Sequence, residues 1–527
     1  MKRKIFKSLL LIVSIMLVFA GGANAFGGDI TPIPPGPETS LPDYIGAPAK
    51  AHPTANNGVP QNPFLAPNGF THTHKDIWMS DSANAAGPLG INPVILSTTL
   101  PETHENSWLT PCGTYAFDSH GHLILDCWGK DEASVVMVDP DTLEVLTHYD
   151  LEVVTGDPVG EGGQDFPPSM WSIYGYLDNL DQMHLVSEGK RIITLGEVGS
   201  PSSPMFDEVG EYDLSELLEE TQDSIRGVIV DFQGRYWLNV ARTATIYLLN
   251  PATYHGVGDL KSIDLGEGEF IRNGLALTKE GAAYIVTTKA MYRVDAGADD
   301  QPRIVWRQAY ETDDKVRPGQ VEQGSGTTPT ILGEGKYVAI TDNAEQLQLV
   351  VYRTDARLDP NEGRVVCTLP VFDFPGGDRG ASWNSLVGSR NSIIIQNTGD
   401  YFWDWANYED AHLEVPSKPG IERVDIDPNG NGCTKVWVNV ETAGAMTLEL
   451  STKAGLIYTQ DRKWDAENNV YAYYFVAIDF RTGEVVWEKL MGAGDKFDSI
   501  GMPVFIGPNK ALYGPLQGGL MMLKDTP

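Results

Sequence analysis

One eleven-residue pattern occurs eight times along this chain and constrains its fold more than any other feature. Each copy has an apolar run, a turn at Gly or Asn, and a second apolar run. Gly and Asn tolerate the positive φ of tight turns, so the pattern is typical of a β-hairpin. The copies, which begin 45 to 68 residues apart, are FDSHGHLILDC (117–127), LVSEGKRIITL (185–195), VDFQGRYWLNV (230–240), LTKEGAAYIVT (277–287), ILGEGKYVAIT (331–341), LVGSRNSIIIQ (386–396), LSTKAGLIYTQ (450–460) and VFIGPNKALYG (504–514). Short strands repeated at such a period predict propeller blades.

Two further strand-like segments follow most hairpins and complete a four-stranded blade. They are joined by turns rich in Asp, Pro and Gly, as in SVVMVDPDTLEVLTHY (134–149). The last repeat ends after GGLMMLKD (518–525) with three strands, so its fourth must come from elsewhere. PVILSTTL (93–100) is the expected donor, because an open ring would leave an unpaired sheet edge. We therefore predict an all-β, eight-bladed propeller of four-stranded antiparallel blades, closed by an N-terminal strand.

The chain before the repeats has a different character. Residues 1–25 combine a basic start, an apolar stretch and the small-residue site Ala23-Asn24-Ala25, which predicts a cleaved signal peptide and a periplasmic or secreted protein. Residues 26–70 form a lead-in rich in Pro, Gly and Asn, expected to be extended, and residues 71–527 a single propeller domain.

Charge and hydropathy narrow the choice of partners. The formal net charge is −33, which disfavours nucleic acid and anionic membrane surfaces as partners. No segment reaches the roughly 20 apolar residues of a membrane span, so no membrane insertion is expected. The oligomeric state stays open, and a small molecule is the expected ligand.

Four cysteines in an exported chain are expected to pair. If Asp118 to Gly121 form the first hairpin turn, Phe117 faces His122. The same register then places Cys112 opposite Cys127, within reach of a disulfide. By elimination, Cys367 would pair with Cys433.

The blade pattern also assigns residues to two faces of the ring. Loops that lead into the first strand and out of the second share one face, and most long insertions fall there, which predicts the functional face. Cationic, aromatic and amide side chains at these positions suit recognition of carboxylate or phosphate. The predicted ligand-binding residues are Arg226, Arg242, Arg272, Lys289, Arg379, Trp383, Asn384, Trp171 and Thr328. Mutual neutralisation of basic and acidic groups between blades is the structural alternative.

Hard oxygen donors at the same strand ends could bind Ca²⁺. The candidate metal ligands are Asn273, Glu322, Asp342 and Asn343. A separate run, 425–431, begins like a calcium loop but has Val436 where an acidic ligand is needed, so an acidic turn is favoured. His72 with His74, and His120 with His122 at a hairpin turn on the opposite face, are assigned no catalytic role.

Two blades resemble known propeller families. FVAIDFRTGEVVWEKLMGAG (475–494) is similar to the quinoprotein repeat at Ala477, Asp479, Thr482, Gly483 and Trp487. That resemblance implies the fold, with pyrroloquinoline quinone (PQQ) and Ca²⁺ as possible cofactors. IRNGLALTKEGAAYIVTT (271–288) resembles the gluconolactonase and strictosidine-synthase-like propellers, which implies that Asn273 is a metal ligand.

Three functions are compatible with these features. The first is an enzyme that acts on a small anionic or oxygen-rich organic molecule at a cationic axial pocket, as a lactonase-type hydrolase or a PQQ/Ca²⁺-dependent oxidoreductase. The second is a non-catalytic propeller that binds a ligand or a protein, with the aromatic segment 401–405 as a contact surface. The third is a structural protein. No general acid or base in the sequence decides among them.

Overall fold

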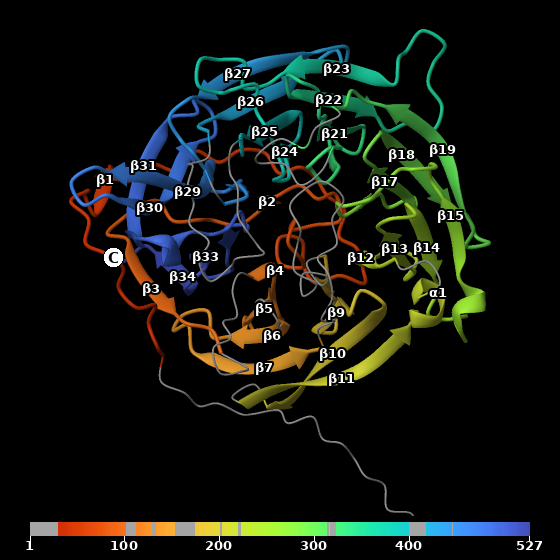
Figure 1. Ribbon diagram of the computed structural model, residues 1–527, viewed down its shortest axis with the longest axis horizontal. Helices are drawn as coiled ribbons and strands as arrows, with labels where there is room; N and C mark the ends of the chain where they lie inside the picture. Colours follow the sequence, from red (N-terminus) through yellow and green to blue (C-terminus); the bar gives the residue numbers. More distant parts are fainter. Residues whose placement is uncertain are drawn as a thin grey trace, which may run out of the picture.

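A computed structural model describes residues 30–101, 112–128, 133–152, 174–200, 203–219, 223–313, 316, 323–399, 418–444 and 446–527. Their strands form eight mainly antiparallel sheets arranged as a ring (Figure 1), which confirms the predicted eight-bladed propeller. The predicted signal peptide lies outside the described residues.

The first four blades follow one another along the chain. From the axis outward their strands are β4 (Cys112–Phe117), β5 (Leu123–Trp128), β6 (Ala133–Val138) and β7 (Val145–Leu151); β8 (Tyr176–Leu177), β9 (Gln182–Ser187), β10 (Arg191–Ser200) and β11 (Ser203–Asp213); β12 (Ile225–Val230), β13 (Tyr236–Val240), β14 (Thr245–Leu249) and β15 (Lys261–Asp264); and β16 (Ala276–Leu277), β17 (Ala282–Val286), β18 (Ala290–Ala296) and β19 (Pro302–Ala309). The short helices α1 (Ser215–Glu219) and η2 (Val257–Asp259) lie in connections around the third blade.

The other four blades complete the ring. Their strands are β20 (Thr330–Leu332), β21 (Tyr337–Thr341), β22 (Gln348–Arg353) and β23 (Val365–Pro370); β24 (Val387–Ser389), β25 (Ser392–Gln396), β26 (Ile421–Ile426) and β27 (Cys433–Asn439); β28 (Glu449–Ser451), β29 (Leu456–Asp465), β30 (Val470–Asp479) and β31 (Val485–Ala493); and β32 (Phe505–Ile506), β33 (Leu512–Leu516), β34 (Gly519–Lys524) and β3 (Val94–Thr98). The turn η4 (Asp495–Phe497) follows β31. Within the described residues, no helix is long and apolar enough to cross a bilayer.

The ring closes where the sequence predicts. Strand β3 pairs antiparallel with β34, from Val94 opposite Lys524 to Thr98 opposite Leu520. The last blade thus takes its outer strand from the N-terminal side of the chain. Two other N-terminal strands flank the seventh blade: β1 (Tyr44–Gly46) pairs with its outer strand β31, and β2 (Ser82–Ala83) pairs in parallel with its inner strand β28.

The apolar core lies between successive blades. One cluster, for example, joins Val387 and Ile394 of the sixth blade to Leu450 and Ile457 of the seventh. Trp487, one of the residues that resembles the quinoprotein repeat, is fully buried in β31. Successive side chains of a strand point to opposite faces of the blade, and each face packs against a neighbouring blade. Both faces of a blade are therefore apolar.

Both expected disulfides are present, as suits an oxidising compartment. The register from which Cys112–Cys127 is predicted is nevertheless wrong at the turn, because Phe117 faces Leu123 and not His122. An irregularity between Cys112 and Thr114 shifts the register by one residue. This β-bulge restores the opposition of Cys112 and Cys127.

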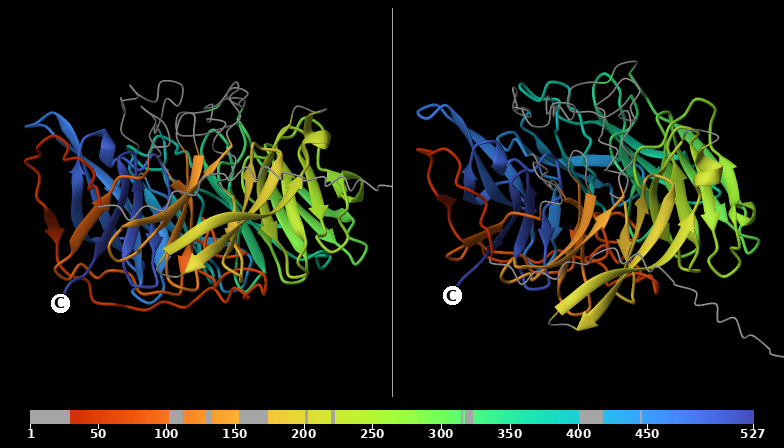
Figure 2. Two further views of the ribbon diagram at one scale, coloured as in Figure 1. Left: turned by 90° about the horizontal axis from the view of Figure 1, so that it is seen from below. Right: turned by 60° about the horizontal axis from the view of Figure 1, so that its bottom comes forward.

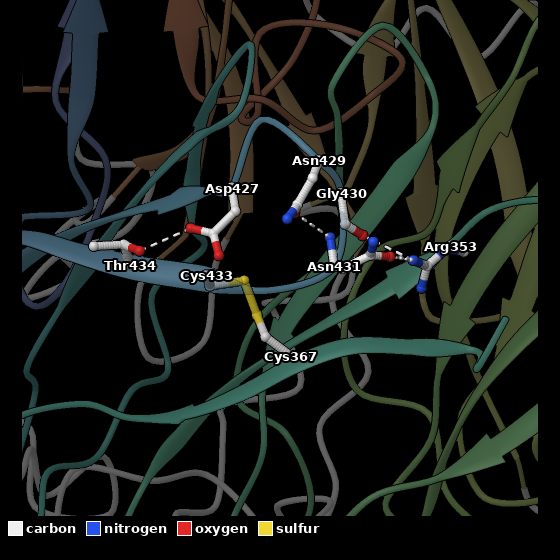
Figure 3. Close-up of a disulfide and its surroundings, with 8 residues drawn as sticks. All are labelled: Arg353, Cys367, Asp427, Asn429, Gly430, Asn431, Cys433 and Thr434. Carbon is white, nitrogen blue, oxygen red and sulfur yellow. Dashed lines mark hydrogen bonds between the residues drawn. A yellow bond between two sulfur atoms is a disulfide. The ribbon is translucent and has the colours of Figure 1, made fainter.

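The second disulfide, Cys367–Cys433, joins β23 of the fifth blade to β27 of the sixth (Figure 3). Beside it, residues 425–431 form a turn whose polar groups are hydrogen-bonded to other residues of the chain. Asp427 accepts a hydrogen bond from Thr434, and Arg353 donates to the Gly430 carbonyl and to Asn431. The acidic-turn interpretation of this segment fits these contacts.

The two disulfides close loops of different length. Removing each one is therefore expected to lower the free energy of unfolding by a different amount. Replacing Cys112 and Cys127 by Ala opens a loop with a sequence separation of 15, and replacing Cys367 and Cys433 opens one of 66. Loop entropy gives costs of about 3 and about 4 kcal/mol, respectively. Urea denaturation of both double variants tests this order; a larger loss from the 112–127 pair would contradict it.

Segment 70–83 closes the centre of the ring, and we call it the axial plug. Every residue from Thr71 to Asp81 is buried. Its carbonyls accept hydrogen bonds from the inner edges of six blades, in the pairs Phe117 N to Phe70 O, Leu177 N to Thr71 O, Leu277 N to Ile77 O, Ile331 N to Trp78 O, Gly388 N to Ser80 O and Leu450 N to Asp81 O. The plug thus satisfies backbone groups that an inner strand would otherwise leave unpaired.

The plug lies toward the face that carries the turns between first and second strands. The chain on either side of it, red to orange in Figure 2, runs along this same face of the ring. Positive φ values at Lys75 (74°), Met79 (54°) and Asp81 (47°) curl the segment. The inner strands begin at the opposite face of the ring.

A buried ion pair anchors the plug to the last two blades. The Nζ of Lys75 lies 3.5 Å from Oε2 of Glu449, and both side chains are fully buried. Lys75 also donates to the Val504 carbonyl at 3.4 Å and lies over the Phe505 ring. Glu449 accepts the Ile506 N–H at 2.8 Å. Each charge is therefore compensated by the other and by backbone groups.

Lys75→Met leaves the Glu449 carboxylate buried without its cation, and we expect it to lower the free energy of unfolding by about 3 to 5 kcal/mol. The double variant Lys75→Met/Glu449→Gln keeps an acceptor for Ile506 without a buried charge, so it should be more stable than Lys75→Met alone. Chemical denaturation of wild type, both single variants and the double variant measures the coupling. Additive losses would show that the two groups stabilise the plug independently.

Candidate functional site at the propeller axis

A histidine and an aspartate of the axial plug form a hydrogen-bonded pair at the axis. The Nδ1 of His74 lies 3.0 Å from Oδ2 of Asp81. With a proton on Nδ1 shared with the carboxylate, Nε2 is the acceptor nitrogen. Both residues are buried, and the curl of the plug brings these residues, seven positions apart, face to face.

Two hydroxyl groups meet the other nitrogen of this histidine. Thr328 Oγ1 and Ser385 Oγ each lie 3.3 Å from His74 Nε2. They come from the segments that lead into β20 and β24, the inner strands of the fifth and sixth blades. An imidazole oriented by a carboxylate and facing hydroxyls is the arrangement that general-base catalysis uses.

Tyr174 and Arg226 lie next to this pair. The rings of Tyr174 and His74 are 6.0 Å apart. Burial raises the pKa of Tyr174, while the nearby Arg226 charge and a hydrogen bond with Thr328 oppose that shift. Burial also lowers the pKa of Arg226, whose side chain begins in β12 and is 6% exposed. A guanidinium in such low-dielectric surroundings attracts anions more strongly than one at the surface.

A small cavity of about 20 Å³ adjoins these groups, with His72, His74, Tyr174 and Asn239 in its lining. That volume suits one water molecule and not an organic ligand. Burial and the neighbouring His74 and Lys75 hold the pKa of His72 well below its usual range, so this imidazole stays neutral.

The five cationic residues predicted from the sequence lie in different surroundings. Arg226 is at the axis, and Arg272 is partly buried next to Asn273. Arg242 is exposed and lines a separate cavity of about 500 Å³ with Asp264 and Glu267. Lys289 is exposed, and Arg379 is an exposed ion-pair partner of Glu345. A role of these residues in ligand binding stays a prediction.

The other predicted ligand-binding residues lie near inner-strand ends. Thr328 contacts His74, as described above. The Asn384 amide donates to Gln396 Oε1 at 2.9 Å, and the Trp383 backbone N–H donates to Thr398 Oγ1 at 3.2 Å. Trp171 and the aromatic segment 401–405 lie outside the described residues.

The described members of the predicted metal-ligand set are engaged in contacts with other residues of the chain. The Asn273 amide donates to the Ser325 carbonyl at 2.9 Å. The Asp342 carboxylate accepts N–H groups of Ala344 and Gln348, and burial raises its pKa to about 7. Asn343 is buried in a short parallel bridge to Thr312, and Glu322 lies outside the described residues. Calcium binding by this group, with or without PQQ, stays a prediction.

Sequence reasoning missed Asp81, Tyr174 and Ser385, and it assigned no catalytic role to His74, the residue that they surround. Their signal was weak, since each is a common residue in a segment without a recognisable motif. One clue was available: THTHKD (71–76) places two histidines, a lysine and an aspartate directly before the apolar run IWM. Charged residues in an apolar segment are buried only where partners compensate them.

Comparisons with known proteins add little about function. No family model matches the chain. An uncharacterized protein of Archaeoglobus fulgidus is 26% identical over 276 residues, a match that covers 48% of this chain and 52% of the relative. This chain therefore aligns with about half the length of that protein.

Three solved structures illustrate the structural likeness. Streptogramin B lyase is 11% identical, with 82% of this chain and 98% of that chain covered and a TM-score of 0.39. Sqt1 of Chaetomium thermophilum, bound to the N-terminus of the ribosomal protein L10, is 10% identical, with coverage of 90% and 100% and a TM-score of 0.44. Hydrazine synthase of Kuenenia stuttgartiensis is 10% identical, with coverage of 71% and 99% and a TM-score of 0.39. Such scores carry no argument about the activity of this chain.

Asp76 of the plug predicts a pH dependence of stability. Burial raises the pKa of its carboxyl to about 7, although Ser80 and the Trp78 N–H donate hydrogen bonds to it. A raised folded-state pKa contributes stability that is complete below pH 3.8 and is lost as the pH rises through about 7. Asp76→Asn stays neutral, so its stability relative to wild type should increase by about 4 kcal/mol between pH 4 and 8.

Denaturation curves at pH 4, 6 and 8 measure this difference, with the exposed Asp359→Asn as the control. Parallel pH profiles for wild type and Asp76→Asn would contradict the assignment.

Proposed function

We propose that this protein is an exported hydrolase that acts on the lactone or ester of a small, oxygen-rich organic acid at the propeller axis. The observation that carries the proposal is His74, with Nδ1 held by Asp81 and Nε2 facing two hydroxyl groups. Together they place one imidazole nitrogen beside two hydroxyl groups at inner-strand entries and next to a cavity with room for one water molecule, so the ester would have to reach it from the end of the axis where the inner strands begin.

In the proposed reaction, His74 acts as general base on a water molecule. Nε2 removes a proton as the water oxygen attacks the carbonyl carbon, and the Asp81 carboxylate stabilises the imidazolium that forms. The carbon–oxygen bond of the ester then breaks, and the imidazolium returns the proton to the leaving alkoxide. The products are an acid and an alcohol, joined in one hydroxy acid when the substrate is a lactone.

Tyr174 and Arg226 supply the other requirements of this chemistry. Because burial raises the pKa of Tyr174, its hydroxyl stays protonated and can donate to the developing oxyanion. Arg226 provides positive charge for the carboxylate of a substrate or product. Thr328 and Ser385 hold the water or a substrate hydroxyl at Nε2.

The test measures turnover of a panel of lactones and esters of sugar acids, and the protons released report the rate of hydrolysis. His74→Gln and Asp81→Asn should each lower kcat by a factor of about 10² to 10⁴, the range that general-base catalysis contributes. His255→Gln, on an exposed loop, is the matched control. Circular dichroism and melting curves verify that each variant is folded.

Two outcomes would count against the proposal. Unchanged turnover in folded His74→Gln would remove His74 from the chemistry. An absence of turnover in wild type, with binding of sugar acids that Arg226→Gln weakens, would favour a non-catalytic binding propeller. Reconstitution with PQQ and Ca²⁺ followed by dye-linked oxidation tests the oxidoreductase alternative in the same preparation.

A further inference from the structure

Four potential metal ligands converge on the face of the ring that carries the hairpin turns, opposite the face where the inner strands begin. Asp118, His120 and His122 belong to the turn between β4 and β5 of the first blade, and Glu197 belongs to β10 of the second blade. One ligand atom from each of the four lies within 4.8 Å of the others. Ligands around a single tetrahedral ion are about 3.4 Å apart, so small side-chain rotations bring these four into place.

Individual contacts show how the side chains face one another. The Nδ1 of His122 lies 2.6 Å from Oδ2 of Asp118, and the Nδ1 of His120 lies 3.9 Å from Oε2 of Glu197. The Asp118 side chain is fully buried, and those of His122 and Glu197 are 13% and 14% exposed. The His120 side chain is 47% exposed, which leaves the group accessible to an ion from solvent.

The two carboxylates of this group lie unfavourably close in the absence of a cation. Oε1 of Glu197 is buried without a hydrogen-bond partner among the described residues. No lysine or arginine of the described part of the chain forms an ion pair with Asp118 or Glu197. A divalent cation would satisfy the free oxygen and remove the repulsion.

The turn that presents the three ligands is held in place by its surroundings. Asp181, from the adjacent turn of the second blade, accepts hydrogen bonds from both the backbone N–H and the hydroxyl of Ser119. The His122 N–H donates to Oδ1 of Asp118 at 2.7 Å. These outer contacts orient ligands in the way that metal sites require.

We propose that Asp118, His120, His122 and Glu197 form a zinc site that links the first blade to the second. Two imidazoles and two carboxylates in a four-ligand set suit Zn²⁺, whereas Ca²⁺ and Mg²⁺ favour oxygen ligands and higher coordination numbers. Bound zinc connects a hairpin turn to the third strand of the next blade and stabilises that interface. The site is independent of the proposed chemistry at the axis.

The experiment measures metal binding directly. Protein stripped with a chelator is titrated with Zn²⁺, and the bound metal is counted by elemental analysis after gel filtration. We expect one zinc ion per chain and a higher Tm on binding. Glu197→Gln and His120→Ala should each weaken affinity at least about 100-fold, while His255→Ala, an exposed histidine elsewhere, leaves it unchanged. Co²⁺ in the wild-type site should show the strong visible absorption of tetrahedral coordination.

His120 is half exposed, so its loss should leave the fold intact and keep the test interpretable. Structural zinc sites saturate at free Zn²⁺ concentrations far below about 10 micromolar. Absence of bound zinc in wild type at about 10-micromolar free Zn²⁺ would therefore overturn the proposal. Unchanged zinc affinity in folded His120→Ala and Glu197→Gln would do the same. Binding of Ca²⁺ as tight as that of Zn²⁺ would refute the choice of metal.

Discussion

The inner edges of the blades impose the constraint on which the rest of this structure depends. Each blade ends at the axis in a strand with one side unpaired, and exposed backbone groups must be hydrated or bonded. In this chain the plug, residues 70–83, accepts hydrogen bonds from six of these strands. The strand β3, a few residues further on, closes the outer edge of the last blade. One N-terminal stretch therefore completes the ring at its centre and at its seam.

Filling the axis with this segment brings charge into the interior. The backbone bonds fix where His74, Lys75, Asp76 and Asp81 lie, and all four side chains are buried. Each polar side chain has a partner nearby: Lys75 pairs with Glu449, His74 pairs with Asp81, and Asp76 accepts a hydrogen bond from Ser80. Buried charges are costly unless paired, so each pair also specifies which blade meets which part of the plug. The same pairing leaves His74 Nε2 turned toward the hydroxyls of Thr328 and Ser385.

The two candidate sites differ in how they are built. At the axis, groups from the plug and from inner strands meet around one imidazole, and partners within the chain satisfy most of them. At the interface between the first and second blades, the carboxylates of Asp118 and Glu197 lie close together, and only imidazoles balance their charge. The first arrangement is suited to moving a proton and the second to holding a cation, because neighbouring carboxylates without a lysine or arginine partner gain most from a metal.

The sequence by itself determined the architecture. Hairpin periodicity, the three-stranded last repeat and PVILSTTL (93–100) predicted eight blades and the closing strand, because these follow from local turn chemistry and the need to pair every edge. The sequence also predicted the Cys112–Cys127 disulfide. The predicted hairpin register was wrong by one residue at the turn, and a β-bulge that no sequence pattern indicates restored the opposition of the two cysteines. Only the tertiary structure decided that 70–83 fills the axis, that Asp81 and Ser385 meet His74, and that Glu197 joins Asp118 across two blades. Such contacts join residues that are distant in sequence, and they depend on how the chain curls and on which blades become neighbours, which short-range patterns do not encode.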